Sequence, residues 1–164
     1  MYKINEYVIY GMQGACKIKD ITEVDFGKKG NLYYKLIPEC DKGSEIYVSV
    51  KNGEKKMRRP ISKEQAIQMV QEIPKVKGIW ISDDRARENA YKEAIVKGDY
   101  EEMMGMLAGL FEKRNDRIKQ GKRQTELDDR IFRNTKKVFL GELSVVLDMD
   151  IDFLEEEIMK QVGR

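Results

Sequence analysis

The sequence predicts an α+β protein, with a small antiparallel β-domain in the first part of the chain and a compact all-helical domain after it. In residues 1–61, short runs of β-branched and aromatic residues alternate with Gly-rich turns, which is typical of a small curled sheet or open barrel. Beyond Pro74, apolar residues recur at the three- and four-residue spacing of amphipathic helices. A chain of 164 residues is long enough for two small domains.

Five short strands are expected, and turn residues separate most of them. The strands cover residues 7–10, 15–24, 32–37, 46–50 and 57–60. In the second strand, Cys16, Ile18 and Val24 are the candidates for inward-facing positions. Pro38 is expected to end the third strand, because proline lacks the N–H that a sheet ladder needs. The pair Asn52-Gly53 predicts a turn after the fourth strand.

Capping side chains mark where the helices begin. Ser62 and Gln65 form a capping box that opens a short helix, and Pro74 ends it. Later N-caps are expected among residues 82–84 and at Asp99, Thr125 and Asp150. The apolar residues of the first helix are Ile67, Met69, Val70 and Ile73, and those of the next, expected to face inward, are Ala90, Tyr91, Ala94 and Ile95. The later helices carry apolar stripes at helical spacing: Met104, Leu107, Phe111 and Ile118; then Phe132, Phe139, Leu143 and Val146; then Ile151, Leu154, Ile158 and Val162. The expected divisions are residues 1–61 as the β-domain, 62–79 as a helix and linker, and 80–164 as the helical domain.

Trp80 is the only tryptophan, and it stands just before a helix N-terminus at the junction between the two parts. Arg85 and Arg87 follow it in the first turn of that helix. A large amphipathic ring beside arginines and free helix N–H groups suits a nucleic-acid backbone or groove. The alternative is that Trp80 is a buried residue that packs between the domains.

Charge is distributed unevenly along a nearly neutral chain of net charge +2. Residues 113–137 carry 10 Lys and Arg against 4 Asp and Glu, whereas residues 138–164 carry 2 against 7. A basic block beside an acidic tail fits an anion-binding face on a balanced protein, although solvated helix surface would also explain it.

The residue types argue for a binding protein rather than an enzyme. The chain has no histidine, so it offers no imidazole base and no His metal site, and we expect no cofactor. The pairs Asp83-Asp84 and Asp128-Asp129 are expected to be helix-cap and first-turn acids; a two-metal carboxylate site is the remote alternative. Cys16 and Cys40 are expected to be reduced, half-buried strand residues, with a disulfide as the alternative. No apolar run is long enough to span a membrane, and we expect a cytoplasmic protein.

Residues 8–18, Val-Ile-Tyr-Gly-Met-Gln-Gly-Ala-Cys-Lys-Ile, are similar to the first hairpin of the CarD/CdnL family of bacterial transcription regulators. Residues 32–36, 46–50 and 57–62 are similar to its next strands and its strand-to-helix passage. In the second half the similar segments are residues 79–94, 125–133 and 141–143. The resemblance extends over essentially the whole chain and in the same order.

The resemblance implies a Tudor-like β-domain that binds the β subunit of RNA polymerase. It also implies a helical domain that contacts promoter DNA at the upstream edge of the transcription bubble and stabilises the open complex. Trp80 would insert into the minor groove without reading sequence. The protein is expected to be monomeric and nucleoid-associated. The alternative function is a protein–protein adaptor of the transcription machinery that has no direct DNA contact.

The site residues follow from the resemblance together with charge. The expected DNA-binding residues are Trp80, Arg85, Arg87, Lys92, Lys113, Arg114, Arg130 and Arg133. The expected polymerase-binding residues are Glu23, Val24, Ile46, Tyr47, Val48, Ser49, Val50, Lys51 and Arg58. An exposed strand edge there could pair with a strand of the partner.

The sequence departs from the family pattern at a few positions. Gly11 replaces the usual proline of the first turn. Val24 and Ser49 stand where some members carry arginines that meet the polymerase, which affects the charge-pairing part of the expected contact. The helicase motifs of the larger transcription–repair coupling factor are absent, so the stand-alone regulator is expected.

Overall fold

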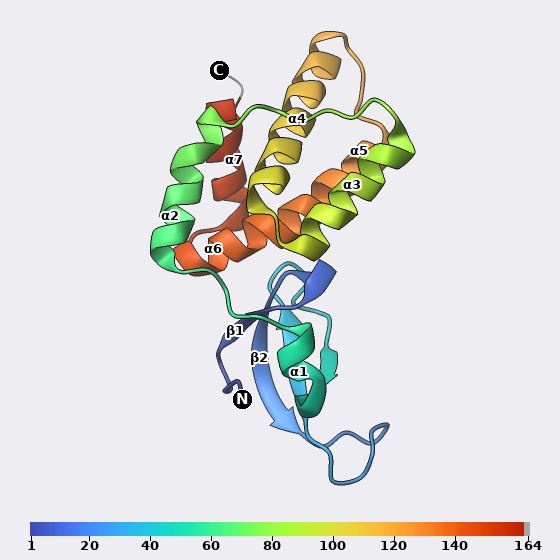
Figure 1. Cartoon of the computed structure of the whole chain (residues 1–164), viewed down its shortest axis with the longest axis vertical. Coiled ribbons are helices and arrows are strands. Elements are labelled where there is room, and N and C mark those ends of the chain that lie inside the picture. Colours follow the sequence, from blue (N-terminus) through green and yellow to red (C-terminus); the bar gives the residue numbers. More distant parts are fainter. Residues whose placement is uncertain (163–164) are drawn as a thin grey trace.

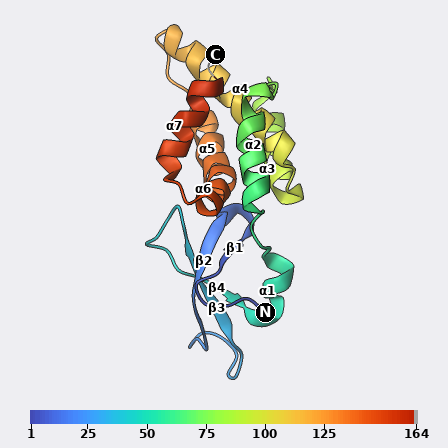
Figure 2. The same cartoon turned by 90° about the vertical axis from the view of Figure 1, so that its left-hand side faces the viewer.

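The computed structural model describes residues 1–162 and confirms the α+β class: a four-stranded antiparallel sheet lies below a group of helices (Figures 1 and 2). The strands are β1 (Tyr7–Ile9), β2 (Ala15–Thr22), β3 (Tyr33–Pro38) and β4 (Ile46–Ser49). They are paired in the order β1-β2-β3-β4, so the sheet is a meander that does not close into a barrel.

Alternating side chains build the core of the β-domain. Cys16 and Ile18 are completely buried, as predicted, and they pack with Tyr34 and Leu36 of β3. A register shift between Ile18 and Asp20 interrupts the β2–β3 pairing. Val24, the third expected inward position, lies beyond the end of β2 and is only partly buried.

The segment after β4 differs from the prediction. Residues expected to form a turn around Asn52-Gly53 are inside helix α1 (Val50–Lys56). A side chain at Gly53 would come within 2.7 Å of the Tyr34 ring, so the glycine lets α1 lie directly on the sheet core. Residues 57–60, expected as a short fifth strand or an edge, form no strand; a single bridge joins Arg58 to Ile9 at the β1 edge of the sheet.

The cysteines occupy different environments. Cys16 is buried in β2, and burial raises the pKa of its thiol to about 12. Cys40 is exposed in the turn after β3, so the expectation of a half-buried strand residue is wrong for it. Both thiols are free.

Six further helices follow α1. They are α2 (Lys63–Glu72), α3 (Asp84–Lys97), α4 (Tyr100–Lys119), α5 (Glu126–Thr135), α6 (Gly141–Leu147) and α7 (Ile151–Val162). The predicted caps are confirmed: backbone N–H groups donate to the side chains of Ser62, Asp83, Asp99, Thr125 and Asp150. Local sequence therefore determines where these helices begin.

Two features of the helical part differ from the expected stripes. The long helix expected after Thr125 is divided by a π-helical turn, residues Lys136–Leu140, although Phe139 and Leu143 are still buried. Ile67 and Ile118, two of the expected apolar residues, are exposed. Ile118 lies in the last turns of α4, which extend beyond the neighbouring helices (Figures 1 and 2).

The two parts of the molecule are in direct contact. Gly14 lies so close to the π-helical turn that a side chain there would meet the Lys137 carbonyl oxygen at 2.6 Å. The Lys137 ammonium donates to the Gln13 side chain at 2.7 Å. Helix α2 packs with the helical core through Ala66, and Ile73, in the 3-10 turn Ile73–Lys75 that follows it, is buried in the same core, so residues 63–73 are part of the helical layer.

Candidate functional site

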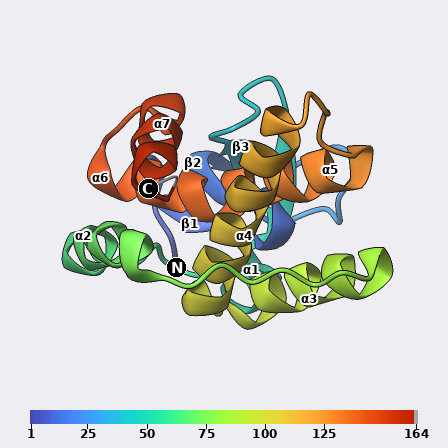
Figure 3. The same ribbon diagram turned by 90° about the horizontal axis from the view of Figure 1, so that it is seen from above.

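The segment that carries Trp80 is extended and crosses helix α4 on its way from α2 to α3 (Figures 1 and 3). The Ile79 N–H donates to the Gly105 carbonyl at 2.8 Å. A side chain at Gly109 would come within 2.0 Å of the Ile79 carbonyl oxygen. Gly105 and Gly109 are one turn apart on α4. Without side chains, they leave a shallow groove on the helix, called the glycine track below, in which the Ile79 backbone beside Trp80 lies.

The indole of Trp80 is partly buried against the helical core and has two cations next to it. The Arg87 guanidinium carbon lies 4.2 Å from the ring centroid, and the Lys113 ammonium lies 5.1 Å from it. Cations attract the electron-rich face of an indole, so these contacts restrain its orientation. The ring is therefore held in place while part of it stays accessible.

Arg87 is itself buried, with a relative exposure of 5%. Its guanidinium donates to Asp128 at 2.7 and 3.0 Å and to the Ile81 carbonyl at 2.7 Å. A third partner, Asp84, accepts at 2.8 Å. Because these donors are used inside the protein, Arg87 is not available to an external phosphate. It connects α3 with α5 and with the Trp80 segment.

Asp128 lies in the first turn of α5, as expected, where the helix dipole favours an acid. It is also completely buried, which the sequence did not indicate. Its main partner is Arg87, 41 residues away in the sequence. The neighbouring pair Asp83-Asp84 also fits the expectation, because Asp83 caps α3 and Asp84 is exposed in its first turn.

The other expected DNA-binding cations lie on α3, α4 and α5. Arg85 and Arg133 are exposed and form no ion pair within residues 1–162. Lys92 and Arg130 both contact the carboxylate of Glu88, at 3.5 and 3.0 Å. These four side chains are at the surface of α3 and α5, where the acids Asp84 and Glu88 lie among them.

Arg114 and Lys113 stand on α4. The Arg114 guanidinium carbon is 5.5 Å from the Phe132 ring centroid, and Lys113 faces Trp80. Farther along, Lys113, Arg117 and Lys122 line a shallow hollow with Asp116 and Gln120. The basic block noted in the sequence, residues 113–137, therefore includes the part of α4 around Lys113 that lies next to Trp80.

The expected polymerase-binding residues other than Arg58 gather at one edge and one end of the sheet. β4 is the last strand, and within the described residues nothing pairs with its outer edge. Val50 and Lys51 lie in the first turn of α1 rather than in the strand. Ser49 faces Tyr33 of β3, which in turn pairs with Thr22 at the end of β2, so Glu23 and Val24 follow close by.

Phe26 was not identified from the sequence, yet it is the most exposed aromatic residue at this end, with a relative exposure of 74%. Its ring contacts Tyr47 and Tyr33 edge-to-face, with centroid separations of 5.4 and 6.3 Å. The only sequence signal is one aromatic residue in an otherwise polar loop. The three rings form an aromatic knob next to the β4 edge.

Arg58 is engaged between the domains. Its guanidinium donates to both oxygens of the Glu142 carboxylate at 2.8 Å, and it also contacts the Tyr100 hydroxyl. Glu142 is 1% exposed and accepts further hydrogen bonds from the Tyr100 hydroxyl at 2.6 Å and from the Ile61 N–H at 3.0 Å. Burial and this carboxylate raise the pKa of Tyr100. Glu142 and Tyr100 were not among the predicted site residues.

Within residues 1–162, no three His, Cys, Asp or Glu side chains are grouped so that they could hold a metal ion. In the same part of the chain, no helix has the length and apolar character needed to cross a bilayer.

Comparison with known families identifies the first part of the chain. Residues 2–61 match the family model described as the CarD-like/TRCF RID domain. This range contains all four strands and α1, and it ends directly before the N-cap of α2. The helices that surround Trp80 lie outside the matched range. A search of curated proteins finds no match to the chain.

Proposed function

We propose, from the membership of residues 2–61 in the CarD-like/TRCF RID domain family, that the protein is a non-enzymatic transcription regulator that binds RNA polymerase. The β-domain would bind the polymerase β subunit, and the helical domain would hold promoter DNA at the upstream fork and stabilise the open complex. The observation that carries the DNA part is the partly exposed indole of Trp80, which the buried Arg87 and the partly exposed Lys113 hold in place.

The polymerase contact would use the β4 edge and the aromatic knob. An unpaired edge offers backbone N–H and C=O groups to a partner strand. Phe26, Tyr33 and Tyr47 would supply the buried anchor that gives such an interface most of its affinity. Because Val24 and Ser49 are uncharged, we propose that apolar contact carries more of this interface than charge pairing does.

On the DNA side, Trp80 would insert where the base pairs separate. Unstacking a base step costs a few kcal/mol, and an inserted ring offsets part of that cost. Arg85, Lys92, Arg130 and Arg133 would contact phosphates and fix the position of the protein without reading sequence. Arg87 would act as a positioning residue, because its donors are already used inside the protein.

The second candidate function is a protein–protein adaptor without DNA contact. The partial burial of Trp80 against the helical core supports it. In that case the indole would be a packing residue and the exposed cations would be solvated helix surface.

Salt dependence of binding to a forked promoter fragment separates the two functions. Phosphate contacts release counterions, so the affinity of a polymerase–regulator complex for the DNA should fall more steeply with salt than that of polymerase alone. The measurement is fluorescence anisotropy of a labelled fork, at several salt concentrations, with and without the regulator. An identical slope and affinity in both titrations would favour the adaptor.

A further inference from the structure

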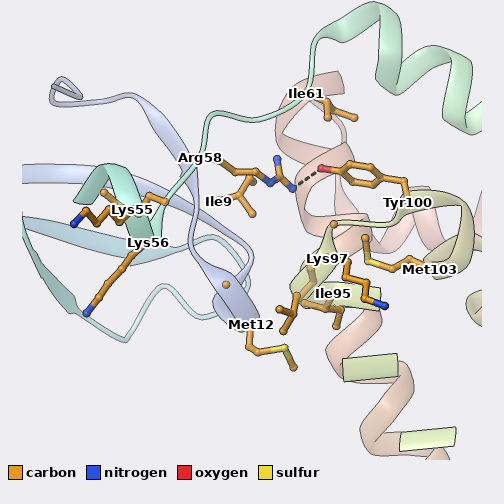
Figure 4. Close-up of a pocket in the computed structure, with 15 residues that line it drawn as sticks. Ile9, Met12, Lys55, Lys56, Arg58, Ile61, Ile95, Lys97, Tyr100 and Met103 are labelled. Atoms are coloured by element: carbon orange, nitrogen blue, oxygen red, sulfur yellow. Dashed lines mark hydrogen bonds between the residues drawn. The ribbon is translucent and has the colours of Figure 1, made fainter. Parts of the chain in front are cut away.

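We propose that the cleft between the two domains binds an acidic peptide segment that carries a bulky apolar side chain and belongs to a partner protein. The cleft has a volume of about 640 Å³, which is in the range of ligand-binding sites. Figure 4 shows that it opens between Ile9 and Met12 of the β-domain and Ile95 and Met103 of the helical domain. The proposal concerns neither the Trp80 surface nor the β4 edge.

All charged residues that line the cleft are basic. Its lining includes Lys55, Lys56, Arg58 and Lys97 and contains no acidic residue; because Arg58 is already paired with Glu142, the available positive charge comes from the three lysines. Within residues 1–162, Lys55 and Lys56 form no ion pair, and Lys97 contacts only Glu93, at 3.9 Å. In a chain with 31 basic and 29 acidic residues, this local excess of positive charge favours an anionic ligand.

The remaining lining is apolar and adaptable. Met57 and Met103 form part of the buried floor, while Met12 and Val96 at the opening are 38% and 81% exposed. Methionine side chains adjust to irregular partners and are common in grooves that bind peptides. An apolar floor is poorly matched to a sugar-phosphate backbone, so a peptide with acids around one apolar anchor fits better than duplex DNA does.

The lysines stand on both domains. Lys55 and Lys56 are at the C-terminal end of α1, and Lys97 is at the C-terminal end of α3. In Figure 4 the side chains of Lys55 and Lys56 point away from the helical domain, but all three lysines are exposed, so their flexible stems can turn toward acids of the ligand. A bound segment would therefore bridge the two domains next to the Arg58–Glu142 ion pair.

The test uses the full chain, labelled with ¹³C at the methionine methyl groups, and a synthetic twelve-residue peptide of Glu and Asp around a central Leu-Phe pair. Binding should shift the methyl signals of Met12, Met57 and Met103, while Met149 and Met159, which lie outside the cleft, should not move. Assignment comes from single Met→Leu variants. A peptide in which Ser replaces Leu and Phe should bind at least about tenfold more weakly, because it lacks the apolar anchor.

Charge reversal supplies the matched controls. The pair Lys56→Glu and Lys97→Glu should weaken binding by about tenfold, which is the combined effect of two exposed ion pairs. Lys63→Glu, at an exposed position on α2, should leave the affinity unchanged. Equal weakening by both changes would mean that only the net charge matters and would overturn the proposal.

Two other occupants are distinguishable outcomes. A short duplex DNA that shifts Met12 and Met57 when the peptide does not would overturn the peptide in favour of nucleic acid. Shifts that grow with protein concentration alone would identify a second copy of this chain, whose α7 exposes Phe153 near Asp152 and Glu156. Absence of any shift at millimolar peptide, with a correctly folded protein, would also overturn the proposal. None of these outcomes depends on polymerase binding.

Discussion

The guanidinium carbon of Arg87 lies 4.2 Å from the centre of the Trp80 ring, and the same guanidinium is bound to the fully buried carboxylate of Asp128. The tryptophan is thereby joined through one side chain to helices α3 and α5. Such a brace reduces the freedom that the indole would lose on insertion between bases, which lowers the cost of binding.

Replacing Arg87 by Met should destabilise the protein by about 3–5 kcal/mol, because the charge of Asp128 would remain buried without its partner. The matched control is Arg85→Met, at an exposed position in the same helical turn, which should change stability by less than about 0.5 kcal/mol. Urea unfolding followed by circular dichroism measures both values. Equal effects of the two substitutions would show that the ion pair contributes nothing.

A methyl group at Gly109 should displace the Trp80 segment, because its Cβ would lie 2.0 Å from the Ile79 carbonyl oxygen, which is backbone and cannot rotate away. Gly109→Ala should therefore shift the fluorescence of the only tryptophan and increase its quenching by acrylamide. Gly105→Ala is the control, since its Cβ would meet the flexible Ile79 side chain at 2.7 Å and should have a smaller effect. The reverse order of the two effects would contradict the proposed glycine track.

These contacts show where prediction from sequence succeeds. The helix starts at Ser62, Asp99 and Thr125 were predicted because a cap is a hydrogen bond between residues three positions apart. The position of Trp80 before a helix follows from the same local signals. The burial of Cys16 and Ile18 was also predicted from sequence. Alternate residues of a strand face the same side, so this prediction does not depend on knowing the partner strand.

The parts that were missed depend on contacts between distant residues. Arg87 looks like a surface arginine until Asp128 is brought beside it by the packing of α3 on α5. The Asn52-Gly53 pair is a strong turn signal, but tertiary contact between Gly53 and Tyr34 places it inside a helix. Glu142 belongs to an apolar helix face, and only the approach of Arg58 from the other domain explains its burial.

Replacing Glu142 by Gln should weaken the contact between the domains. Arg58 would lose its bidentate ion pair, and the Tyr100 hydroxyl would donate to a neutral amide instead of a carboxylate. Arg58 is 43% exposed and recovers hydration, so we expect a loss of about 2 kcal/mol rather than the full cost of a buried unpaired charge. Differential scanning calorimetry should show the single transition broaden or divide. Arg59→Gln is the control, since Arg59 is 66% exposed and contacts Glu6 at 3.5 Å; an equal response would contradict the role of Glu142.

Replacing Phe26 by Ala should weaken binding to the polymerase by about tenfold or more, because truncation of an aromatic anchor costs on the order of 1–2 kcal/mol or above. Phe153→Ala removes another exposed aromatic side chain, from α7, and should leave polymerase affinity unchanged. Biolayer interferometry with immobilised polymerase measures both. If Phe26→Ala binds like the wild type, the aromatic knob is not part of the interface.

The lifetime of the open complex formed by purified polymerase tests most directly whether the ring of Trp80 touches promoter DNA. Trp80→Ala should shorten the regulator-dependent lifetime about fivefold or more, as expected for the loss of roughly 1–3 kcal/mol of ring–base stacking, with little change in melting temperature. Phe153→Ala should behave like the wild type. An unchanged lifetime, or a large drop in melting temperature for Trp80→Ala, would contradict the account and identify Trp80 as a packing residue.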